Sequence, residues 1–271
     1  MDMNGAIVQG GASRRGGDGK PRVAVISDLH ANLAALQAVF DDIDALGIRE
    51  VWCLGDIVGY GPRPAECARL VRERCAAIIK GNHETALEPE GAFRFTLRAR
   101  AAIAWTRGEL DGQPDGAELV KWLQELPPSF EKGDRFFVHG SPAEPTEEYL
   151  MPRDAGNPYK MDSQWPRVRQ YAFCGHTHIP GVFEEGVEHF TRSEEMLGGN
   201  AYLLDNSAKA IINVGSVGQP RDRNPDACYV TFDGDSVVYR RVRYDVEETR
   251  RLILLNTRLD PFLADRLVEG R

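Results

Sequence analysis

Five short polar motifs most constrain the fold of this chain, because each directly follows an apolar run with the character of a buried strand. The motifs contain five of the six histidines: Asp28-Leu29-His30, Gly55-Asp56, Gly81-Asn82-His83, His139-Gly140 and Gly175-His176-Thr177-His178. The apolar runs cover residues 23–27, 50–54, 76–80, 135–138 and 171–174. Short apolar runs that end in a turn are typical of strands buried on both faces. The sequence therefore predicts strands whose carboxyl ends carry polar side chains.

Helical patterns alternate with the first three of these strands. Residues 31–46 have apolar side chains at helical spacing, and residues 64–74 begin with a proline that suits the first turn of a helix. This strand–helix–strand order predicts parallel βαβ units with right-handed crossovers. Because ligand sites of open parallel sheets gather at the carboxyl edge of the strands, we expect the first three motifs to meet there.

The remainder of the chain has a different pattern. Residues 92–125 indicate two helices separated at 108–116, and the Pro-rich residues 141–168 indicate a long loop with one helical turn. Short strands at 181–185, 200–205, 209–214, 226–232 and 236–243 predict an antiparallel half, followed by helices at 247–257 and 262–268. We find no repeat or linker, so residues 22–271 are predicted to form a single α/β domain. Residues 1–21 are rich in glycine and polar residues and predict a disordered tail.

Charge and cysteine content narrow the class of protein. A net charge of -8 argues against a broad nucleic-acid-binding surface, although it permits a small phosphate-bearing substrate. The cysteines are dispersed without CxxC spacing, which is typical of reduced thiols in a cytoplasmic protein. No apolar run is long enough for a membrane span. We therefore expect a cytoplasmic enzyme with no membrane partner, and a homo-oligomer remains open.

The donor atoms of the motifs indicate a particular kind of metal site. Asp and Asn offer oxygen and neutral His offers nitrogen, a mixture that suits first-row divalent ions such as Mn, Fe, Zn or Ni. The motifs supply too many donors for one four-coordinate ion. The surplus predicts two divalent ions that share a bridging carboxylate.

The order of the five motifs resembles the calcineurin-like metallophosphoesterase superfamily over residues 22–245. Residues 27–32, 55–61, 139–142 and 215–222 are similar to its prokaryotic YfcE-like branch, which is related to diadenosine tetraphosphatases. The resemblance implies a four-layer α/β/β/α sandwich with the metals at the carboxyl ends of central strands.

The resemblance also implies a role for each motif residue. One ion would be held by Asp28, His30 and His178. The other would be held by Asn82, His139 and His176, and Asp56 would bridge the two. His83 would lie outside the metal shell and face the substrate phosphate.

Residues beside the motifs have two interpretations. Asn32 either caps the helix that follows it or binds a phosphate. The Gly-rich stretch 215–222 is either only a turn or a loop whose Arg221 or Gln219 contacts substrate, and Arg63 is a weaker candidate. We take Asn32 and Arg221 as the predicted substrate-binding residues.

The stretch 55–61 departs from the protein Ser/Thr phosphatases and the symmetrical diadenosine tetraphosphatases, because those families have an arginine shortly after Gly-Asp. A bidentate phosphate clamp is therefore missing here. Without this clamp, a dianionic monoester should lose more binding energy than a monoanionic diester. Acidic residues in the 141–168 loop should act in the same direction: Glu144, Glu147, Glu148 and Asp154. Glu84, after His83, is instead the residue found in protein phosphatases.

These features predict a dinuclear metal-dependent phosphoesterase. It would hydrolyse small phosphodiesters or nucleotides by attack of a metal-bridging hydroxide, with His83 as the catalytic residue that assists the leaving oxygen. The alternatives are a phosphomonoesterase, a protein or dinucleoside polyphosphate phosphatase, and a non-catalytic scaffold on the same fold. The scaffold is disfavoured because every expected ligand is retained.

Overall fold

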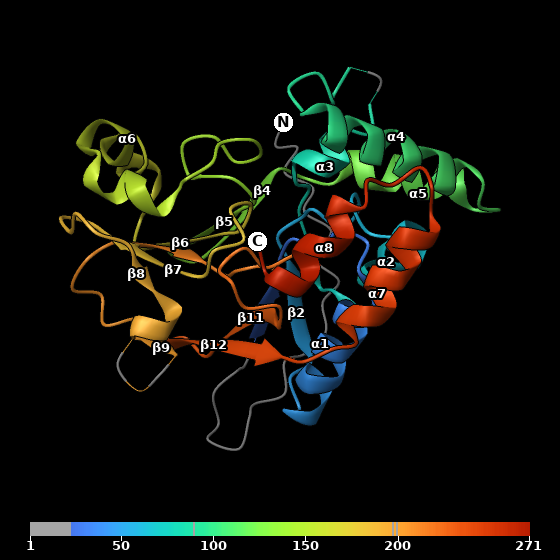
Figure 1. Cartoon of the computed structure of the whole chain (residues 1–271). Helices are drawn as coiled ribbons and strands as arrows, with labels where there is room; N and C mark the ends of the chain where they lie inside the picture. Colours follow the sequence, from blue (N-terminus) through green and yellow to red (C-terminus); the bar gives the residue numbers. More distant parts are fainter. Residues whose placement is uncertain (1–22, 89, 197, 199) are drawn as a thin grey trace.

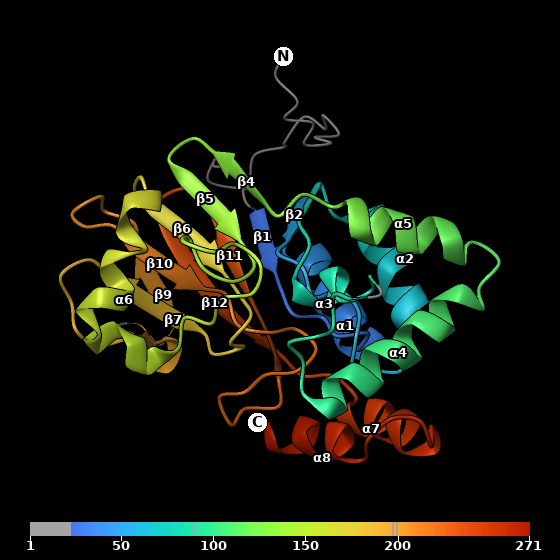
Figure 2. The same cartoon turned by 90° about the horizontal axis from the view of Figure 1, so that it is seen from above.

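The protein is built on two six-stranded mixed sheets that pack face to face, with helices on both outer faces (Figure 1, Figure 2). The computed structural model describes residues 23–88, 90–196, 198 and 200–271. In order across it, the first sheet consists of β3 (Ala77–Ile78), β2 (Glu50–Cys53), β1 (Val23–Ile26), β11 (Ala227–Phe232), β12 (Ser236–Val242) and β9 (Ala201–Leu203). The second sheet consists of β4 (Ser129–Lys132), β5 (Arg135–Val138), β6 (Tyr171–Cys174), β10 (Ala210–Asn213), β7 (Gly181–Glu184) and β8 (Thr191–Arg192).

Strand directions agree with the prediction in both sheets. β1 runs parallel to β2, with Val23 opposite Glu50, and β2 runs parallel to β3. β11, β12 and β9 continue that sheet with antiparallel pairing. In the second sheet β10 pairs parallel with β6 and antiparallel with β7. The expected antiparallel pairing is confirmed among the strands that follow residue 180, and β10 joins them to the earlier strand β6 by a parallel pairing.

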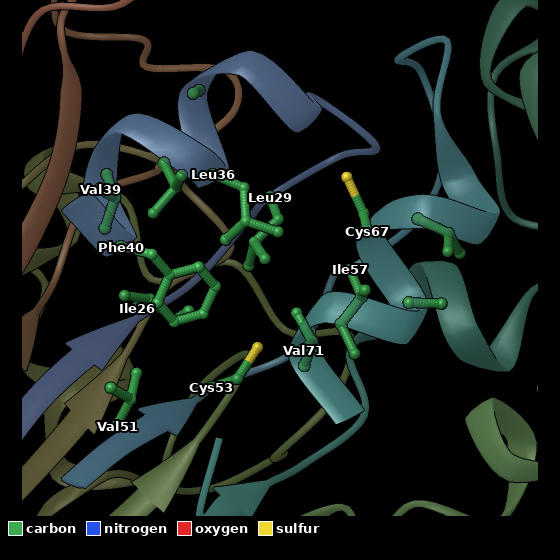
Figure 3. Close-up of a cluster of buried hydrophobic side chains, with 14 of the residues drawn as sticks. Ile26, Leu29, Leu36, Val39, Phe40, Val51, Cys53, Ile57, Cys67 and Val71 are labelled. Atoms are coloured by element: carbon green, nitrogen blue, oxygen red, sulfur yellow. The ribbon is translucent and has the colours of Figure 1, made fainter. Parts of the chain in front are cut away.

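Most helices lie on the outer face of the first sheet. They are α1 (Leu33–Ala45), α2 (Pro64–Arg74), α4 (Leu97–Asp111), α5 (Gly116–Glu125), α7 (Val246–Leu255) and α8 (Phe262–Glu269), with the short α3 (Asn82–Thr85) beside them. Figure 3 shows the core beneath α1 and α2, where Phe40 and Leu36 face Ile26 and Cys53 of the strands. Helical spacing of the apolar residues thus covers one face of the sheet.

Three apolar cores separate four layers. Along β1, Ala24 and Ile26 face the helices, whereas Val23 and Val25 face the second sheet, as strand alternation requires. A third core lies on the far side of the second sheet. There Phe183 and Ile211 pack against the helical turns η1 (Pro152–Gly156), α6 (Pro158–Asp162) and η2 (Trp165–Arg167). The structure therefore confirms the α/β/β/α sandwich.

Some boundaries differ from those expected. The 141–168 segment forms three short helical turns, because Trp165, Met161 and Leu150 are buried against the second sheet. β4 was not predicted, since its residues are only partly buried or exposed. β3 is shorter than residues 76–80, and α5 begins at Gly116. The turn η3 (Ser193–Glu195) follows β8. The predicted tail, residues 1–21, lies outside the described residues.

Candidate metal centre

The seven predicted metal ligands meet at the carboxyl ends of β1, β2, β5 and β6 and at the start of α3. All are buried, and Asn82 is the most accessible at 7%. The structure therefore brings together side chains that are up to 150 residues apart: Asp28, His30, Asp56, Asn82, His139, His176 and His178.

One group of donors comes from the first and last motifs. His178 Nε2 lies 3.1 Å from Asp28 Oδ1 and 3.2 Å from His30 Nε2. His30 Nε2 lies 3.9 Å from Asp28 Oδ1. Donors around a tetrahedral ion with bonds of about 2.0–2.2 Å are roughly 3.3–3.6 Å apart. The three side chains therefore have the spacing that one ion requires.

A second group has similar spacing. His139 Nε2 lies 3.2 Å from Asn82 Oδ1 and 3.0 Å from His176 Nδ1. Asp56 Oδ2 lies 3.3 Å from His139 Nε2 and 3.7 Å from His30 Nε2, so its carboxylate lies between the two groups. This position suits a ligand shared by two ions.

Backbone carbonyls orient three of the imidazoles. His139 Nδ1 lies 2.9 Å from Leu54 O, and His178 Nδ1 lies 2.6 Å from Gln219 O. His176 Nε2 lies 3.1 Å from Glu147 O. Metal-binding histidines usually donate their other ring N–H to such an acceptor, which fixes the tautomer and leaves the first nitrogen free for the ion.

Five of the seven candidate ligands have backbone in the left-handed region, which non-glycine residues rarely adopt. The φ angles are 54° for Asp28, 48° for His30, 51° for Asp56, 64° for His176 and 62° for His178. Such residues cost on the order of 1–3 kcal/mol each unless the surroundings hold them. The concentration of this strain at the candidate ligands indicates that local stability is given up for ligand geometry.

Two glycines allow the loops to approach this closely. A Cβ on Gly81 would lie 2.2 Å from Asp56 Oδ1, and a Cβ on Gly175 would lie 2.3 Å from Asp28 Oδ2. Only a residue without a side chain fits at either position.

Glu84 is a structural residue of the site whose role the sequence reasoning missed. Its buried carboxylate accepts hydrogen bonds from the backbone N–H groups of Asp56, Ile57, Val58 and Gly81. Burial, and then repulsion by Asp56, raises its pKa to about 7. Glu84 thus joins the second and third motifs. A glutamate at the third position of a helix was the available signal.

The electrostatics of the cluster require positive charge. Burial opposes ionisation of Asp28, but the charge and hydrogen bond of His178, together with His139, outweigh it and lower the pKa of this carboxyl. Burial also opposes protonation of His139, yet the neighbouring Asp56 raises its pKa to about 9. Burial lowers the pKa of His176 to about 3. The two buried carboxylates therefore stay ionised and favour a proton on His139, and divalent ions would supply that positive charge instead.

His83 lies beside the cluster, packed among aromatic rings. Its ring centroid is 4.5 Å from that of Tyr60, 5.1 Å from that of Phe95 and 4.7 Å from that of His30. Nε2 lies 3.9 Å from Asp56 Oδ2, whereas Nδ1 is buried without a hydrogen-bond partner. A candidate group of His30, Asp56 and His83 also exists, so a ligand role competes with the predicted one.

Asn32 caps a helix in the structure. Its Oδ1 accepts from Ala35 N and Thr249 Oγ1, and its Nδ2 donates to Gly218 O and Tyr244 Oη. All of these partners belong to the protein. The cap is the interpretation that this geometry supports, and we do not carry Asn32 into the proposed substrate site.

The predicted Arg221 lies next to the cluster, whereas Arg63 does not engage it. Arg221 N donates to His178 O at 3.3 Å, and Arg221 Nη2 donates to Gln219 Oε1 at 2.8 Å. Arg63 pairs with Glu66 on the surface.

The 141–168 loop reaches the site through its backbone and through Tyr149, which stacks on His176 at 3.7 Å between centroids. Its carboxylates are used locally. Glu148 pairs with Lys160, Glu147 pairs with Arg94, and Asp154 and Glu144 accept from nearby backbone N–H groups. The negative charge expected at the mouth is therefore partly neutralised.

Comparison with known proteins agrees with this geometry. The model of the calcineurin-like phosphoesterase superfamily domain matches residues 22–236, and the chain belongs to this superfamily. Among individual proteins, it is 37% identical over 263 residues to the uncharacterized protein MJ0912 of Methanocaldococcus jannaschii, covering 93% of this chain and 99% of that one.

A solved structure of a metallophosphoesterase from Sphaerobacter thermophilus is similar with a TM-score of 0.76 and 36% identity, covering 92% of this chain and 99% of that chain. The chain is also 23% identical over 175 residues to the symmetrical bis(5'-nucleosyl)-tetraphosphatase of Neisseria gonorrhoeae, covering 60% of this chain and 61% of that protein. Across the part of the chain that the structure describes, no helix has the length and apolar character to cross a bilayer.

Proposed function

We propose that the protein is a dinuclear metal-dependent phosphoesterase that hydrolyses small phosphodiesters or nucleotides. One observation carries the proposal: seven buried donors form two groups, and the Asp56 carboxylate lies between them. Asp28, His30 and His178 would hold one ion. The second would be held by Asn82, His139 and His176.

Two bound divalent ions would polarise phosphoryl oxygens and lower the pKa of a water nucleophile. The protein's own contribution is to hold the donor atoms in place and to keep bulk water out of the site. The donors are buried, and their partner nitrogens are fixed by backbone carbonyls, so little reorganisation accompanies reaction.

His83 would hydrogen-bond the leaving-group oxygen from Nε2, the ring atom that faces Asp56, and would act as an acid once an anionic substrate offsets the burial that lowers its pKa to about 4. Nδ1 lies against Gly59, where an added Cβ would come within 2.0 Å of it. Together with the contacts of Tyr60 and Phe95, this fixes the orientation of the ring.

The second candidate function is a dinucleoside polyphosphate phosphatase. The partial similarity to the bis(5'-nucleosyl)-tetraphosphatase of Neisseria gonorrhoeae favours it. The absence of an arginine shortly after Asp56 disfavours this function, because residues 55–61 contain Tyr60 and no arginine. A protein phosphatase is disfavoured for the same reason, and a scaffold has no need of seven buried ligands.

The proposal is tested by removing metals from the purified chain and adding Mn²⁺, Fe²⁺, Zn²⁺ or Ni²⁺ in turn. We expect two ions per chain and hydrolysis of bis-p-nitrophenyl phosphate with at least one metal. The matched control is His189→Ala, which removes the exposed histidine outside the motifs and should change neither result. Absence of turnover with every metal at two ions per chain would overturn the proposal.

We also propose a cytoplasmic location. All five cysteines are free thiols, which suits a reducing compartment. Thiol titration of protein isolated from its source under alkylating conditions tests this, and disulfide-linked cysteines would contradict it.

A further inference from the structure

The imidazole of His30 differs from those of the other candidate histidine ligands at its second ring nitrogen. In His139, His176 and His178 that nitrogen lies 2.9, 3.1 and 2.6 Å from a backbone carbonyl oxygen. Nδ1 of His30 is buried, and among the described residues it has no hydrogen-bond partner. A histidine ligand usually donates this N–H to a carboxylate, a carbonyl or a water. His30 therefore needs an acceptor that the surrounding side chains and backbone do not supply.

His30 also lines a small internal cavity. Nε2 of His30 faces His178 and Asp56, and the two nitrogens of an imidazole point in divergent directions, so Nδ1 points away from the other metal donors. The space open to the centre of a water molecule in the cavity is about 10 Å³. This volume is close to the minimum for one water.

The lining of this cavity suits a water chemically. Four further lining residues carry polar side chains: Asn32, Tyr60, Gln219 and Thr249. A buried water needs about two to four polar partners, whereas a cavity with a wholly apolar lining stays dry. The cavity beside His30 therefore fits one water in both size and polarity.

The opposite wall of the cavity comes from the C-terminal helix pair. Ile253 of α7 and Leu263 and Leu267 of α8 line it, and they belong to a buried apolar cluster against which Tyr60 packs. Figure 1 and Figure 2 show the two helices side by side. The match to the superfamily model ends at residue 236, so both helices lie beyond it. The elements that close the cavity are thus additional to the matched domain.

Thr249 of α7 presents a hydroxyl to this cavity. Its Oγ1 donates to Asn32 Oδ1 at 2.8 Å, so the hydroxyl proton is already used. The oxygen keeps lone pairs that accept hydrogen bonds. A water that accepts from His30 Nδ1 and donates to Thr249 Oγ1 would satisfy both groups. It would also keep the proton of His30 on Nδ1 and leave Nε2 free for an ion.

We propose that an enclosed water between His30 and Thr249 positions the His30 imidazole as a metal ligand, and that α7 and α8 hold this water in place. The inference rests on the proposed function, which assigns His30 to one ion together with Asp28 and His178. Thr249 is a positioning residue, because it acts through the water and His30. The helix pair thereby strengthens the binding of one ion and not of the other.

Thr249→Val tests the inference, because it removes the hydroxyl with little change in shape. Equilibrium dialysis of the full chain against a series of free Mn²⁺ concentrations, followed by elemental analysis, gives a dissociation constant for each ion. Anomalous diffraction at sub-saturating Mn²⁺ shows which position loses occupancy. We expect about tenfold weaker binding of the ion at Asp28, His30 and His178, and a change of less than about twofold at the other ion. Thr249→Ser keeps the hydroxyl and should retain wild-type affinity.

The matched control is Leu259→Ala. Leu259 is buried in the same apolar cluster as Ile253 but does not line the cavity. This variant should lower the free energy of unfolding and leave both dissociation constants unchanged. It separates loss of the water from general loosening of the helix pair.

A high-resolution crystal structure of the wild-type chain tests the water directly, even where Thr249→Val does not fold. We expect one water within about 3.2 Å of both His30 Nδ1 and Thr249 Oγ1. Absence of that water, equal weakening of both ions, or the same selective loss in Leu259→Ala overturns the inference. Failure of the chain with two bound ions to hydrolyse bis-p-nitrophenyl phosphate overturns the proposed function instead, because neither measurement depends on turnover.

Discussion

The metal centre and the core between the two sheets are both buried, but they differ in what stabilises them. Between the sheets Val25, Phe173 and Ile212 are fully buried apolar residues of regular strands, and Phe137 stacks on Phe173 at 4.9 Å. At the candidate metal centre the side chains are polar, and five of the seven candidate ligands have left-handed backbone. The core is stabilised by burial of apolar surface, whereas the candidate centre combines strain with desolvated charge.

The comparison shows that the site depends on its surroundings. Strained, charged residues keep their positions because neighbouring strands, Glu84 and the backbone carbonyls hold them. Changes at the centre should therefore affect metal binding and turnover, and changes in the core should affect folding. The following predictions test this separation.

The largest effect is expected for Asp56→Asn. Its carboxylate lies between both donor groups, and the amide carries no charge to offset two ions. We expect loss of both metals and no measurable turnover, with the fold retained. Elemental analysis and circular dichroism measure this. Two tightly held ions per chain would contradict the bridging role.

His83→Ala should keep both metals and lower kcat by roughly 10²–10⁴, the usual contribution of a positioned acid. The reason is that His83 Nε2 faces Asp56 from outside the two donor groups. Metal content and kcat are measured on the same sample. If metal is lost together with activity, His83 is a ligand in the group with His30 and Asp56.

Phe173→Ala tests the other side of the comparison. Phe173 is fully buried between the sheets, and its truncation should lower the free energy of unfolding by about 3–5 kcal/mol. Urea unfolding of the metal-free and metal-loaded chain should give the same loss. The folded variant should still bind two ions. A specific loss of metal at full folding would show that the two regions are not separable.

The smallest effect concerns substrate charge. We expect bis-p-nitrophenyl phosphate to have a higher kcat/KM than p-nitrophenyl phosphate with Mn²⁺, by less than about tenfold, since one charge near a solvated surface contributes about 1 kcal/mol. The missing arginine after Asp56 is the remaining reason for this diester preference, because carboxylates of the 141–168 loop form local ion pairs. A monoester preference that Arg221→Ala reverses would show that Arg221 clamps the reacting phosphate.

Short-range patterns predicted much of the fold and the motif residues. The apolar run before Asp28 and the helical spacing after Asn32 are local signals, and the structure contains both elements. The parallel pairing of β10 with β6 depends on contacts between distant segments, which a local pattern does not carry. β4 pairs with the adjacent β5 and lacked a signal because its residues are only partly buried or exposed.

The origin of the ligands has a consequence for biosynthesis. Asp28 and Asp56 follow strands of the first sheet, whereas His139 and His176 follow strands of the second. The group that includes Asn82 and His139 is not complete until residue 176 has been synthesised, and the group that includes Asp28 and His30 not until residue 178. Closure of such long loops is a slow, non-local step of folding. If the chain binds metal as proposed, metal loading would therefore report that both sheets have assembled, and a chain stalled before that point would remain without metal and without activity.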